Sequence, residues 1–297
     1  MGYIGEKIQL ILVKVGKRFR HRLTDRQYLT LTHLFFHGSL IRWRNPQTFN
    51  EKLQWLKLYN RRKEYSRVVD KIELKKWASE KLGPGYVIPI LQRWQRPADI
   101  NLDMLPERFV IKCNRTSGDN YIHHGGAKPK TGPVVKQMIV KFEEQPYRRT
   151  GEWPYKNVVP EIFAEEYMES DVQGVLCDYK IYCFNGVPTY IQVQAPIKEA
   201  SGAKYQAFYD AEWNRKEFFH GYPDGTQQEF LKPTNLDRML EIAAKIASDF
   251  VFVRVDLYNV RGEIRLGELT LYPYAGFERF RPDNKVDEEL GKQLKIK

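Results

Sequence analysis

Two stretches near the C-terminus, Phe252-Val-Arg-Val-Asp-Leu-Tyr258 and Arg265-Leu-Gly-Glu-Leu-Thr270, decide the fold of this chain. Both place single polar residues among apolar ones, a pattern that indicates partly buried β-strands. A polar turn that ends at Gly262 separates them, so we expect strands over 250–258 and 263–271 to pair as a hairpin.

The polar residues of this hairpin fall on one face of the predicted sheet. Side chains two positions apart in a strand point the same way. Arg254 and Asp256 therefore share a face of the first strand, and Glu268 and Thr270 share a face of the second. We expect the two carboxylates to lack a fixed cationic partner and to bind Mg²⁺, which prefers oxygen ligands. The alternative is a sheet surface on which Arg254 neutralises Asp256.

A lysine inside an apolar strand marks a second candidate site. Phe109-Val-Ile-Lys-Cys113 carries Lys112 among apolar residues, and a polar, glycine-containing loop over 114–126 follows it. A lysine in a buried strand requires an anion, and such a loop can present backbone N–H groups to phosphate oxygens. A lysine on an edge strand in water is the alternative. Phe163-Ala-Glu-Glu-Tyr-Met168 also predicts a strand, for which an exposed position is favoured.

The order of the remaining elements indicates a mainly helical N-terminal region followed by an α+β region rich in hairpins. Thr24 and the Thr48-Phe-Asn-Glu51 capping box indicate helix starts, and Gly83-Pro84-Gly85 ends a helix. Asn185-Gly186 indicates a hairpin turn. Helices are expected over 24–36, 48–59, 65–82 and 134–144 and from the capping pattern Thr234-Asn-Leu-Asp237, and further strands over 162–168, 175–184 and 188–194.

Composition and missing motifs exclude several classes of protein. The sequence has no P-loop, no GxGxxG turn and no HExxH or CxxC pair, and no apolar run long enough to cross a bilayer. Cys113, Cys177 and Cys183 lack metal-ligand spacing and are expected to be reduced thiols, which fits the cytoplasm.

The net charge of +11 indicates either polyanion binding or a solvated basic surface. Basic residues over 8–22 indicate a surface helix or, alternatively, a helix lying on a membrane.

Together these stretches resemble the ATP-grasp superfamily, and most closely its TupA-like branch, which is associated with bacterial teichuronopeptide and capsule or surface polysaccharide synthesis. The resemblance extends over residues 45–280. It rests on Asn45-Pro-Gln-Thr-Phe-Asn-Glu-Lys-Leu-Gln-Trp-Leu-Lys57, Val69-Asp-Lys71, Phe109-Val-Ile-Lys-Cys-Asn114, Ser117-Gly118, Glu165-Glu-Tyr167, Asp178-Tyr-Lys-Ile-Tyr-Cys-Phe-Asn-Gly186, Arg254-Val-Asp256 and Gly267-Glu-Leu-Thr270.

The resemblance implies an α+β ATP-grasp fold, in which two α/β lobes sandwich ATP beside a mainly helical N-terminal region. The expected division gives the helical region and the start of the core to 1–105. The small lobe with its phosphate loop would occupy 106–170, and the large lobe with the metal site 171–297.

The resemblance also implies how ATP is held. Lys71 and Lys112 would hold its phosphates, and the loop around Ser117 and Gly118 would close over them. Glu165 would lie at the amino group of the adenine. The backbone that follows would contact the adenine ring: Glu166, Tyr167 and Met168.

The metal and the reacting groups are implied in the same way. Asp256 and Glu268 would bind Mg²⁺, Arg254 would face the transferred phosphoryl group, and Lys180 would lie near the nucleotide or the substrate. Thr270 departs from the asparagine of many ATP-grasp enzymes and would be a weaker metal ligand.

The loop Tyr272-Pro-Tyr-Ala-Gly-Phe277 resembles the substrate-facing loop of the superfamily. An acceptor cleft is expected near Arg148, Arg149, Trp153 and Tyr155. His123 and His124 are expected on a solvated loop tip, with contact to phosphate or an acidic substrate as the alternative.

The function implied is that of an ATP-dependent carboxylate–amine ligase that forms an amide through an acyl phosphate. Its expected partners are ATP with Mg²⁺, a uronic acid of a surface glycan or its precursor, and an amino acid or small amine. A cytoplasmic location is expected, with the inner face of the membrane as an alternative. A glycosyltransferase is the alternative enzyme, although the sequence has no DxD motif. A nucleic-acid-binding module is disfavoured, because it leaves the converging carboxylates unexplained.

Overall fold

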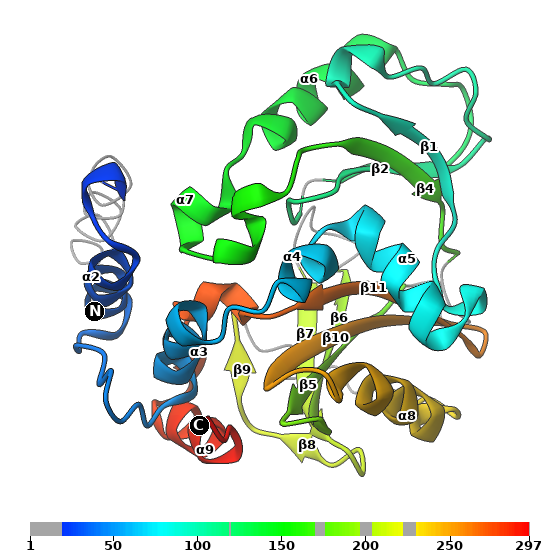
Figure 1. Cartoon of the computed structure of the whole chain (residues 1–297). Helices are drawn as coiled ribbons and strands as arrows, with labels where there is room; N and C mark the ends of the chain where they lie inside the picture. The colour runs from blue at the N-terminus through cyan, green and yellow to red at the C-terminus, as the bar shows by residue number, and fades with distance from the viewer. Residues whose placement is uncertain (1–19, 119, 170–175, 197–203, 222–229, 297) are drawn as a thin grey trace.

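The computed structural model describes residues 20–118, 120–169, 176–196, 204–221 and 230–296, which fold into two lobes with a helical region beside them (Figure 1). Each lobe is built on its own antiparallel sheet, one of four strands and one of six. In the described part of the chain, no helix is both long and apolar enough to cross a membrane.

The small lobe contains the four-stranded sheet, in the order β1-β4-β2-β3. Its strands are β1 (Ile90–Trp94), β2 (Phe109–Cys113), β3 (Tyr121–His123) and β4 (Ile162–Glu166). Helix α6 (Thr131–Glu143) packs on this sheet (Figure 1). Its Met138 is fully buried in one core cluster with Phe109, Ile111 and Ile162. Lys112 and Glu165 therefore belong to interior strands.

The large lobe contains the six-stranded sheet, in the order β11-β10-β5-β6-β7-β8. Its strands are β5 (Asp178–Phe184), β6 (Val187–Pro196), β7 (Lys204–Asp210), β8 (Arg215–Lys216), β10 (Phe252–Val260) and β11 (Glu263–Thr270). Helix α8 (Leu236–Ala247) covers one face with a buried stripe formed by Leu236, Met239, Ile242 and Ile246. A separate ribbon pairs β9 (Phe219–His220) with β12 (Phe280–Arg281).

The helical region links the lobes and closes one side of the molecule (Figure 1). Its helices are α2 (Asp25–His37), α3 (Phe49–Tyr59), α4 (Glu64–Val69), α5 (Lys71–Leu82) and, from the C-terminus, α9 (Lys285–Gln293). Thr24 and Thr48 each form a complete capping box at the start of α2 and α3. Helix α9 packs so closely on the start of α3 that a Cβ at Gly291 would lie 2.0 Å from the Gln47 oxygen.

Short turns complete the path of the chain. They are η1 (Arg20–Arg22), η2 (Pro84–Tyr86), η3 (Pro97–Asp99), α7 (Pro146–Thr150), η4 (Trp153–Asn157) and η5 (Pro273–Gly276). Two of them, α7 and η5, meet α2 and α3 near the cleft described below.

The structure confirms most of the predicted elements. The helices that begin after Thr24 and Thr48 are present, Gly83 ends α5, and the hairpins across 185–186 and 259–262 form. Most of the basic stretch over 8–22 lies outside the described residues, apart from η1.

Four expectations about the elements are wrong. The helix predicted over 65–82 is two helices, because Asp70 leaves the helical conformation and caps α5 by accepting from the N–H groups of Ile72 and Glu73. The loop predicted over 114–126 contains β3. Helix α8 is preceded by Asn235, and no side chain caps it, so the capping box predicted at 234–237 is absent. The strand over 162–168 is buried rather than exposed, because it lies between β1 and β2. Strands β1 and β7 and helix α9 were not predicted.

Candidate active site

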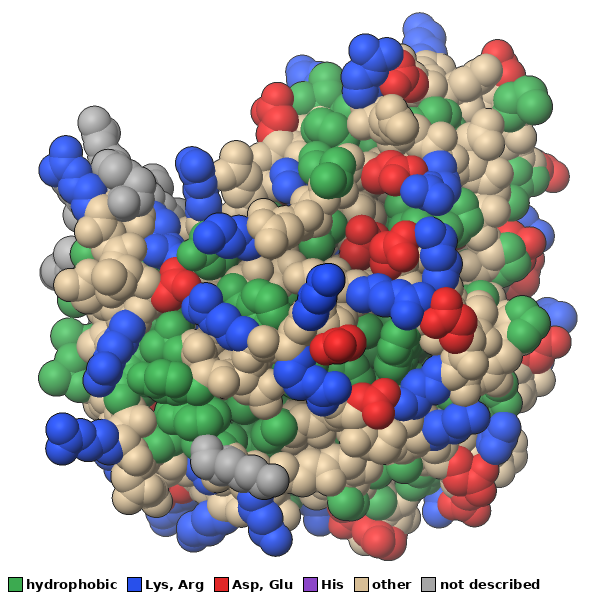
Figure 2. Space-filling view, viewed as in Figure 1, with side chains coloured by type: hydrophobic (Ala, Val, Ile, Leu, Met, Phe, Trp, Pro, Cys, Tyr) green, Lys and Arg blue, Asp and Glu red, His purple; other side chains and the backbone are tan. Residues whose placement is uncertain are grey.

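A cleft of about 1750 Å³ lies between the two sheets and extends to α2. The residues implied to hold ATP, the metal or the reacting groups all line it: Lys71, Lys112, Ser117, Gly118, Glu165, Glu166, Tyr167, Met168, Lys180, Arg254, Asp256, Glu268 and Thr270. Of the residues suggested for the acceptor cleft, Arg148 does not line it. Figure 2 shows acidic and basic side chains mixed across the middle of this view, with hydrophobic side chains gathered toward the α2 side. The cleft thus brings together residues from both lobes and from α5.

The β10–β11 hairpin pairs in the register that the sequence predicted. Arg254 lies opposite Thr270 and Asp256 lies opposite Glu268. Lys180 of β5 lies opposite Asp256 on the other side of β10. Neighbouring strands therefore present a lysine, two carboxylates and an arginine to one region of the cleft.

Asp256 has fixed cationic partners, contrary to the sequence-based expectation. Its Oδ1 accepts from Arg254 Nε at 2.7 Å, and its Oδ2 accepts from Arg254 Nη2 at 2.6 Å and from Lys180 Nζ at 2.9 Å. The side chain is only 5% exposed, so these bonds offset the cost of burying its charge. A neutralised sheet, given above as the alternative, correctly describes this carboxylate.

Glu268 is held more loosely and faces open space. Lys71 Nζ lies 3.4 Å from its Oε2, Arg254 Nη2 lies 3.6 Å from its Oε1, and the side chain is 27% exposed. Burial raises the pKa of Glu268, but Lys71, Lys180, Arg254 and Lys112 outweigh it and lower the pKa to about 2. Glu268 is therefore an ionised carboxylate at neutral pH that remains accessible from the cleft.

The donor set of this hairpin fits Mg²⁺. Within the described residues, no group of three or more His, Cys, Asp or Glu side chains forms a metal cage. Magnesium does not need one, because it binds through one or two carboxylates, substrate phosphates and retained waters. Asp256 and Glu268 would supply the carboxylates. The hydroxyl of Thr270 accepts a hydrogen bond from Arg254 Nη2 at 3.0 Å, which makes it a supporting group.

A second charge cluster lies on the small lobe. Lys112 Nζ contacts Glu165 Oε1, and Lys75 Nζ lies 2.9 Å from Glu165 Oε2. Burial alone would raise the pKa of Glu165. The two lysines lower it by more, so the pKa lies below its usual value and the carboxyl is ionised. Because β2 lies between β4 and β3, the alternative of an edge-strand Lys112 is wrong. The sequence analysis missed Lys75, although its position four residues after Lys71 on α5 indicates the same helix face.

Lys71 joins the two clusters. Its Nζ donates to Thr116 O at 2.8 Å and lies near Glu268, while its backbone N–H donates to Asn114 O at 2.9 Å. Asn114 Nδ2 in turn donates to Asp70 Oδ2 at 3.0 Å, which fixes the start of α5 against the loop after β2. The loop continues through Gly118, whose φ of 72° favours glycine.

The far end of the cleft is formed by α2, α7, η4 and η5. Arg149 and Tyr155 line it, as the sequence suggested for an acceptor site, whereas the Trp153 ring packs on Tyr65 at 6.2 Å. The backbone of η5 is strained, because Tyr274 and Ala275 have positive φ values of 49° and 55°.

The expectation of a solvated loop tip is wrong for His123, whereas His124 is exposed in the loop after β3, as expected. His123 is buried on β3 and packs against Phe109, with 5.1 Å between ring centroids. His124 lines the cleft, and its Nδ1 lies 3.1 Å from the Tyr167 hydroxyl.

Comparison with solved structures finds ATP-grasp ligases. The D-alanine–D-alanine ligase of Bacillus anthracis in complex with ATP is 14% identical, with a TM-score of 0.39, over 69% of this chain and 54% of the ligase. The Helicobacter pylori enzyme is 16% identical, with a TM-score of 0.40, over 83% and 69% of the two chains. The ligase PsnB with its minimal precursor, Mg and ADP is 11% identical, with a TM-score of 0.37, over 75% and 57%. This chain therefore spans about half the length of the Bacillus anthracis ligase.

Comparison with protein families gives a match over most of the chain. A search of curated proteins finds no match. The model of the TupA-like ATP-grasp family matches residues 51–295. This range begins at the third residue of α3 and extends past the end of α9. The chain therefore belongs to the TupA-like ATP-grasp family and has the α+β ATP-grasp fold that its sequence motifs implied.

Proposed function

We propose that this protein is an ATP-dependent ligase that joins a carboxylate to an amine through an acyl phosphate. One observation carries the proposal: Lys71 and Lys112, from the N-terminal half, line the same cleft as Asp256 and Glu268, from the C-terminal half. A phosphate chain with Mg²⁺ needs cations and carboxylates in this combination.

The proposal assigns a task to each group in the cleft. Lys71 and Lys112 hold the ATP phosphates, and the backbone after Ser117 covers them. Asp256 and Glu268 hold Mg²⁺, which supplies positive charge to neutralise the phosphates. Arg254 and Lys180 stabilise the transferred phosphoryl group.

The adenine end of the nucleotide is assigned to β4 and the backbone after it. The strand ends at Glu166, and Tyr167 and Met168 line the cleft directly beyond. Glu165 holds Lys112 and Lys75 in the present arrangement. We therefore assign Glu165 to the support of the phosphate-binding lysine as well as to the adenine edge.

The chemistry requires positioning and charge more than an acid–base triad. The γ-phosphoryl group passes to the carboxylate of the acid substrate, the amine attacks the acyl phosphate, and inorganic phosphate leaves. The intermediate reacts with water, so a closed site favours the amide. The glycine-containing loop around Gly118 is the proposed cover.

We propose a uronic acid of a bacterial surface polysaccharide, or its precursor, as the acid, and an amino acid or small amine as its partner. The net charge of +11 supports an acidic substrate. We expect the reaction in the cytoplasm, where ATP is supplied, with the basic residues before Arg20 as the part that would contact the inner face of a membrane.

An ADP-release screen tests the proposal. Uronic acids are paired with amino acids and small amines in the presence of ATP and Mg²⁺, and ADP release that requires both partners is expected. Asp256→Asn and Glu268→Gln should each lower that release by about a hundredfold or more. Asp249→Asn, which changes an exposed carboxylate paired with Lys81, is the matched control and should keep it. Unchanged turnover in both cleft variants would remove the metal site.

A glycosyltransferase is the competing function. It would bind a nucleotide sugar in this cleft without ATP and release a nucleoside diphosphate that carries the sugar's base. Equilibrium binding of nucleotide sugars and of ATP to the same protein distinguishes the two, and tight binding of the sugar nucleotide alone would favour the alternative.

A further inference from the structure

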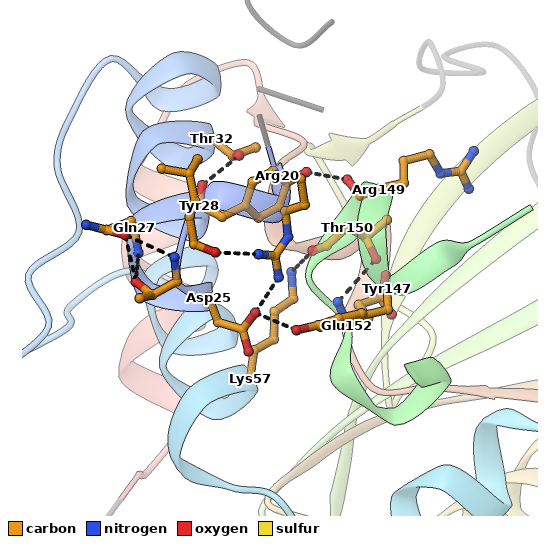
Figure 3. Close-up of polar contacts among 12 residues, drawn as sticks. Arg20, Asp25, Gln27, Tyr28, Thr32, Lys57, Tyr147, Arg149, Thr150 and Glu152 are labelled. Atoms are coloured by element: carbon orange, nitrogen blue, oxygen red, sulfur yellow. Dashed lines mark hydrogen bonds and ion pairs between the residues drawn. The ribbon is translucent and has the colours of Figure 1, made fainter. Parts of the chain in front are cut away.

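The far end of the cleft holds two ionisable groups that the proposed mechanism leaves without a task. Lys57 of α3 is fully buried, and its Nζ donates to Thr150 O at 2.9 Å (Figure 3). It also donates to Ala275 O at 2.7 Å. Glu152, just after α7, lines the cleft beside it. Lys57 is therefore packed behind the part of the cleft wall that contains Thr150, Glu152 and Ala275.

A polar network fixes the segment that carries Glu152. Asp25 of α2 accepts from the Tyr147 hydroxyl at 2.7 Å (Figure 3). It also pairs with Arg61 Nη2 at 2.6 Å. The Tyr28 hydroxyl donates to Arg149 O at 2.6 Å. The bonds from Tyr147 and Arg149 hold α7 against α2, so the segment that leads to Glu152 has a defined position.

The carboxylate of Glu152 differs from three cleft carboxylates that the two sheets carry. In the described part of the chain, no cation lies within 4.0 Å of it, whereas Glu165, Asp256 and Glu268 each contact two cations. Three charged groups act on the pKa of Glu152: Lys57 from α3, Arg149 from α7 and Glu268 from β11. The negative charge of Glu152 in turn raises the pKa of the Tyr155 and Tyr272 hydroxyls. Burial raises the pKa of Glu152 and lowers the pKa of Lys57 to about 7.

Two other carboxylates of the cleft are less suited to act there. Glu166 is exposed at the end of β4, and it adjoins the lysine-bound Glu165. Glu278 lies beyond η5, and the charges that act on it are those of Arg279 and Arg281. Glu152, by contrast, lies near enough to Glu268 for the two charges to interact.

We propose that Glu152 receives the ammonium group of the amine substrate and removes its proton before attack, with Lys57 as the positioning residue. The inference rests on the proposed function. An alkylamine is an ammonium ion at neutral pH and has no lone pair for attack. One proton passes from the ammonium nitrogen to the Glu152 carboxylate. The nitrogen then forms the bond to the acyl carbon, the carbon–oxygen bond to phosphate breaks, and the second proton leaves with the phosphate.

Lys57 positions this base through the backbone. Its ammonium group joins Thr150 O, two residues before Glu152, to Ala275 O in η5. A positive charge beside Glu152 also favours the ionised carboxylate, which is the form able to accept a proton. General-base groups of this kind contribute about 10²–10⁴-fold to rates.

Two nucleophiles used with one acid substrate test the inference. Hydroxylamine is neutral near pH 7 and traps an acyl phosphate as a hydroxamate without a base, whereas an amino acid must first lose a proton. Glu152→Gln should lower amide formation at pH 7 by about a hundredfold and hydroxamate formation far less. The deficit in amide formation should shrink as the pH rises toward the pKa of the amine. Glu152→Asp should recover part of the activity, and Glu143→Gln, which changes an exposed glutamate of α6, should retain it.

Three outcomes would overturn the inference, and they differ in what they imply for the proposed ligase function. Amide formation that is unchanged in Glu152→Gln at pH 7 overturns the inference and leaves the ligase function standing. An equal loss of amide and hydroxamate, at any pH, assigns Glu152 a structural role and also overturns it. If the wild-type protein forms neither hydroxamate nor ADP with the panel of uronic acids, the proposed function fails, and the inference fails with it.

Discussion

The two ends of the cleft handle buried charge in opposite ways. At the phosphate end, carboxylates and cations pair side chain to side chain: Glu165 with Lys75 and Lys112, and Asp256 with Arg254 and Lys180. At the far end, Lys57 bonds only to backbone carbonyls, and Glu152 has no ion pair within the described residues. The first arrangement gives each buried charge a partner of opposite sign, while at the far end burial raises the pKa of Glu152 and lowers the pKa of Lys57 to about 7.

This difference indicates a division of labour. A paired network can hold a charged ligand without changing protonation, because each buried charge is already offset. Unpaired groups with shifted pKa values are suited to proton transfer. The contrast can be tested by removing one group at a time from each end.

The largest effect on stability is expected from Glu165→Gln. The change leaves Lys75 and Lys112 buried without their carboxylate, and removing one partner of a buried ion pair costs about 3–5 kcal/mol. Chemical denaturation of the variant and the wild-type protein measures the loss. Adding Lys112→Met to the variant should recover part of it, because one unpaired charge is then removed. A loss below about 1 kcal/mol would contradict the view that pairing stabilises this end.

Glu268→Gln should lower the free energy of unfolding by up to about 3 kcal/mol, and the loss should depend on pH. The pKa of Glu268 is about 2 in the folded protein and near 4.5 in the unfolded chain. Because the folded pKa is lowered, the stability it contributes is complete above pH 4.5 and is lost as the pH falls toward 2. Thermal unfolding of both proteins between pH 2 and pH 7 measures the difference. An advantage of the wild-type protein that stays constant down to pH 2 would contradict the assigned pKa.

Lys57→Met should lower the free energy of unfolding by a smaller amount, about 2 kcal/mol. The methionine fills similar space, and the charge that was costly to bury disappears, but the carbonyls of Thr150 and Ala275 lose their donor. Lys63→Met, at an exposed position before α4, is the matched control and should be neutral. If Lys57→Met destabilises the protein more than Glu165→Gln does, the proposed contrast between the two ends is reversed.

The smallest effect, below about 0.5 kcal/mol, is expected from Arg93→Ala. Arg93 on β1 pairs with Glu161 at 2.6 Å, close in sequence to Glu165, but its side chain is 45% exposed. Solvent and salt screen such a pair, so denaturation should hardly distinguish the variant from the wild-type protein. A loss comparable to that of Glu165→Gln would show that burial does not set the strength of these pairs.

The site was predictable where local periodicity fixes direction. Strand alternation was enough to assign Arg254, Asp256, Glu268 and Thr270 to one face, and the observed register agrees. The capping boxes at Thr24 and Thr48 likewise depend only on residues three positions apart. The expectation that Asp256 lacks a cation failed. Arg254 on the same strand pairs with it, which was the stated alternative, and only packing adds Lys180 from a strand more than seventy residues earlier.

The sequence by itself determined the motifs whose geometry lies within one strand, turn or helix end, and through them the family and the fold. Only the tertiary structure decided which charges pair: that Lys75 shares Glu165 with Lys112, and that Lys57 lies beside Glu152 beneath η5. The physical reason is that backbone periodicity acts over a few residues, whereas an ion pair depends on how separate elements pack. Burial, and with it the pKa of each group, exists only once that packing is complete.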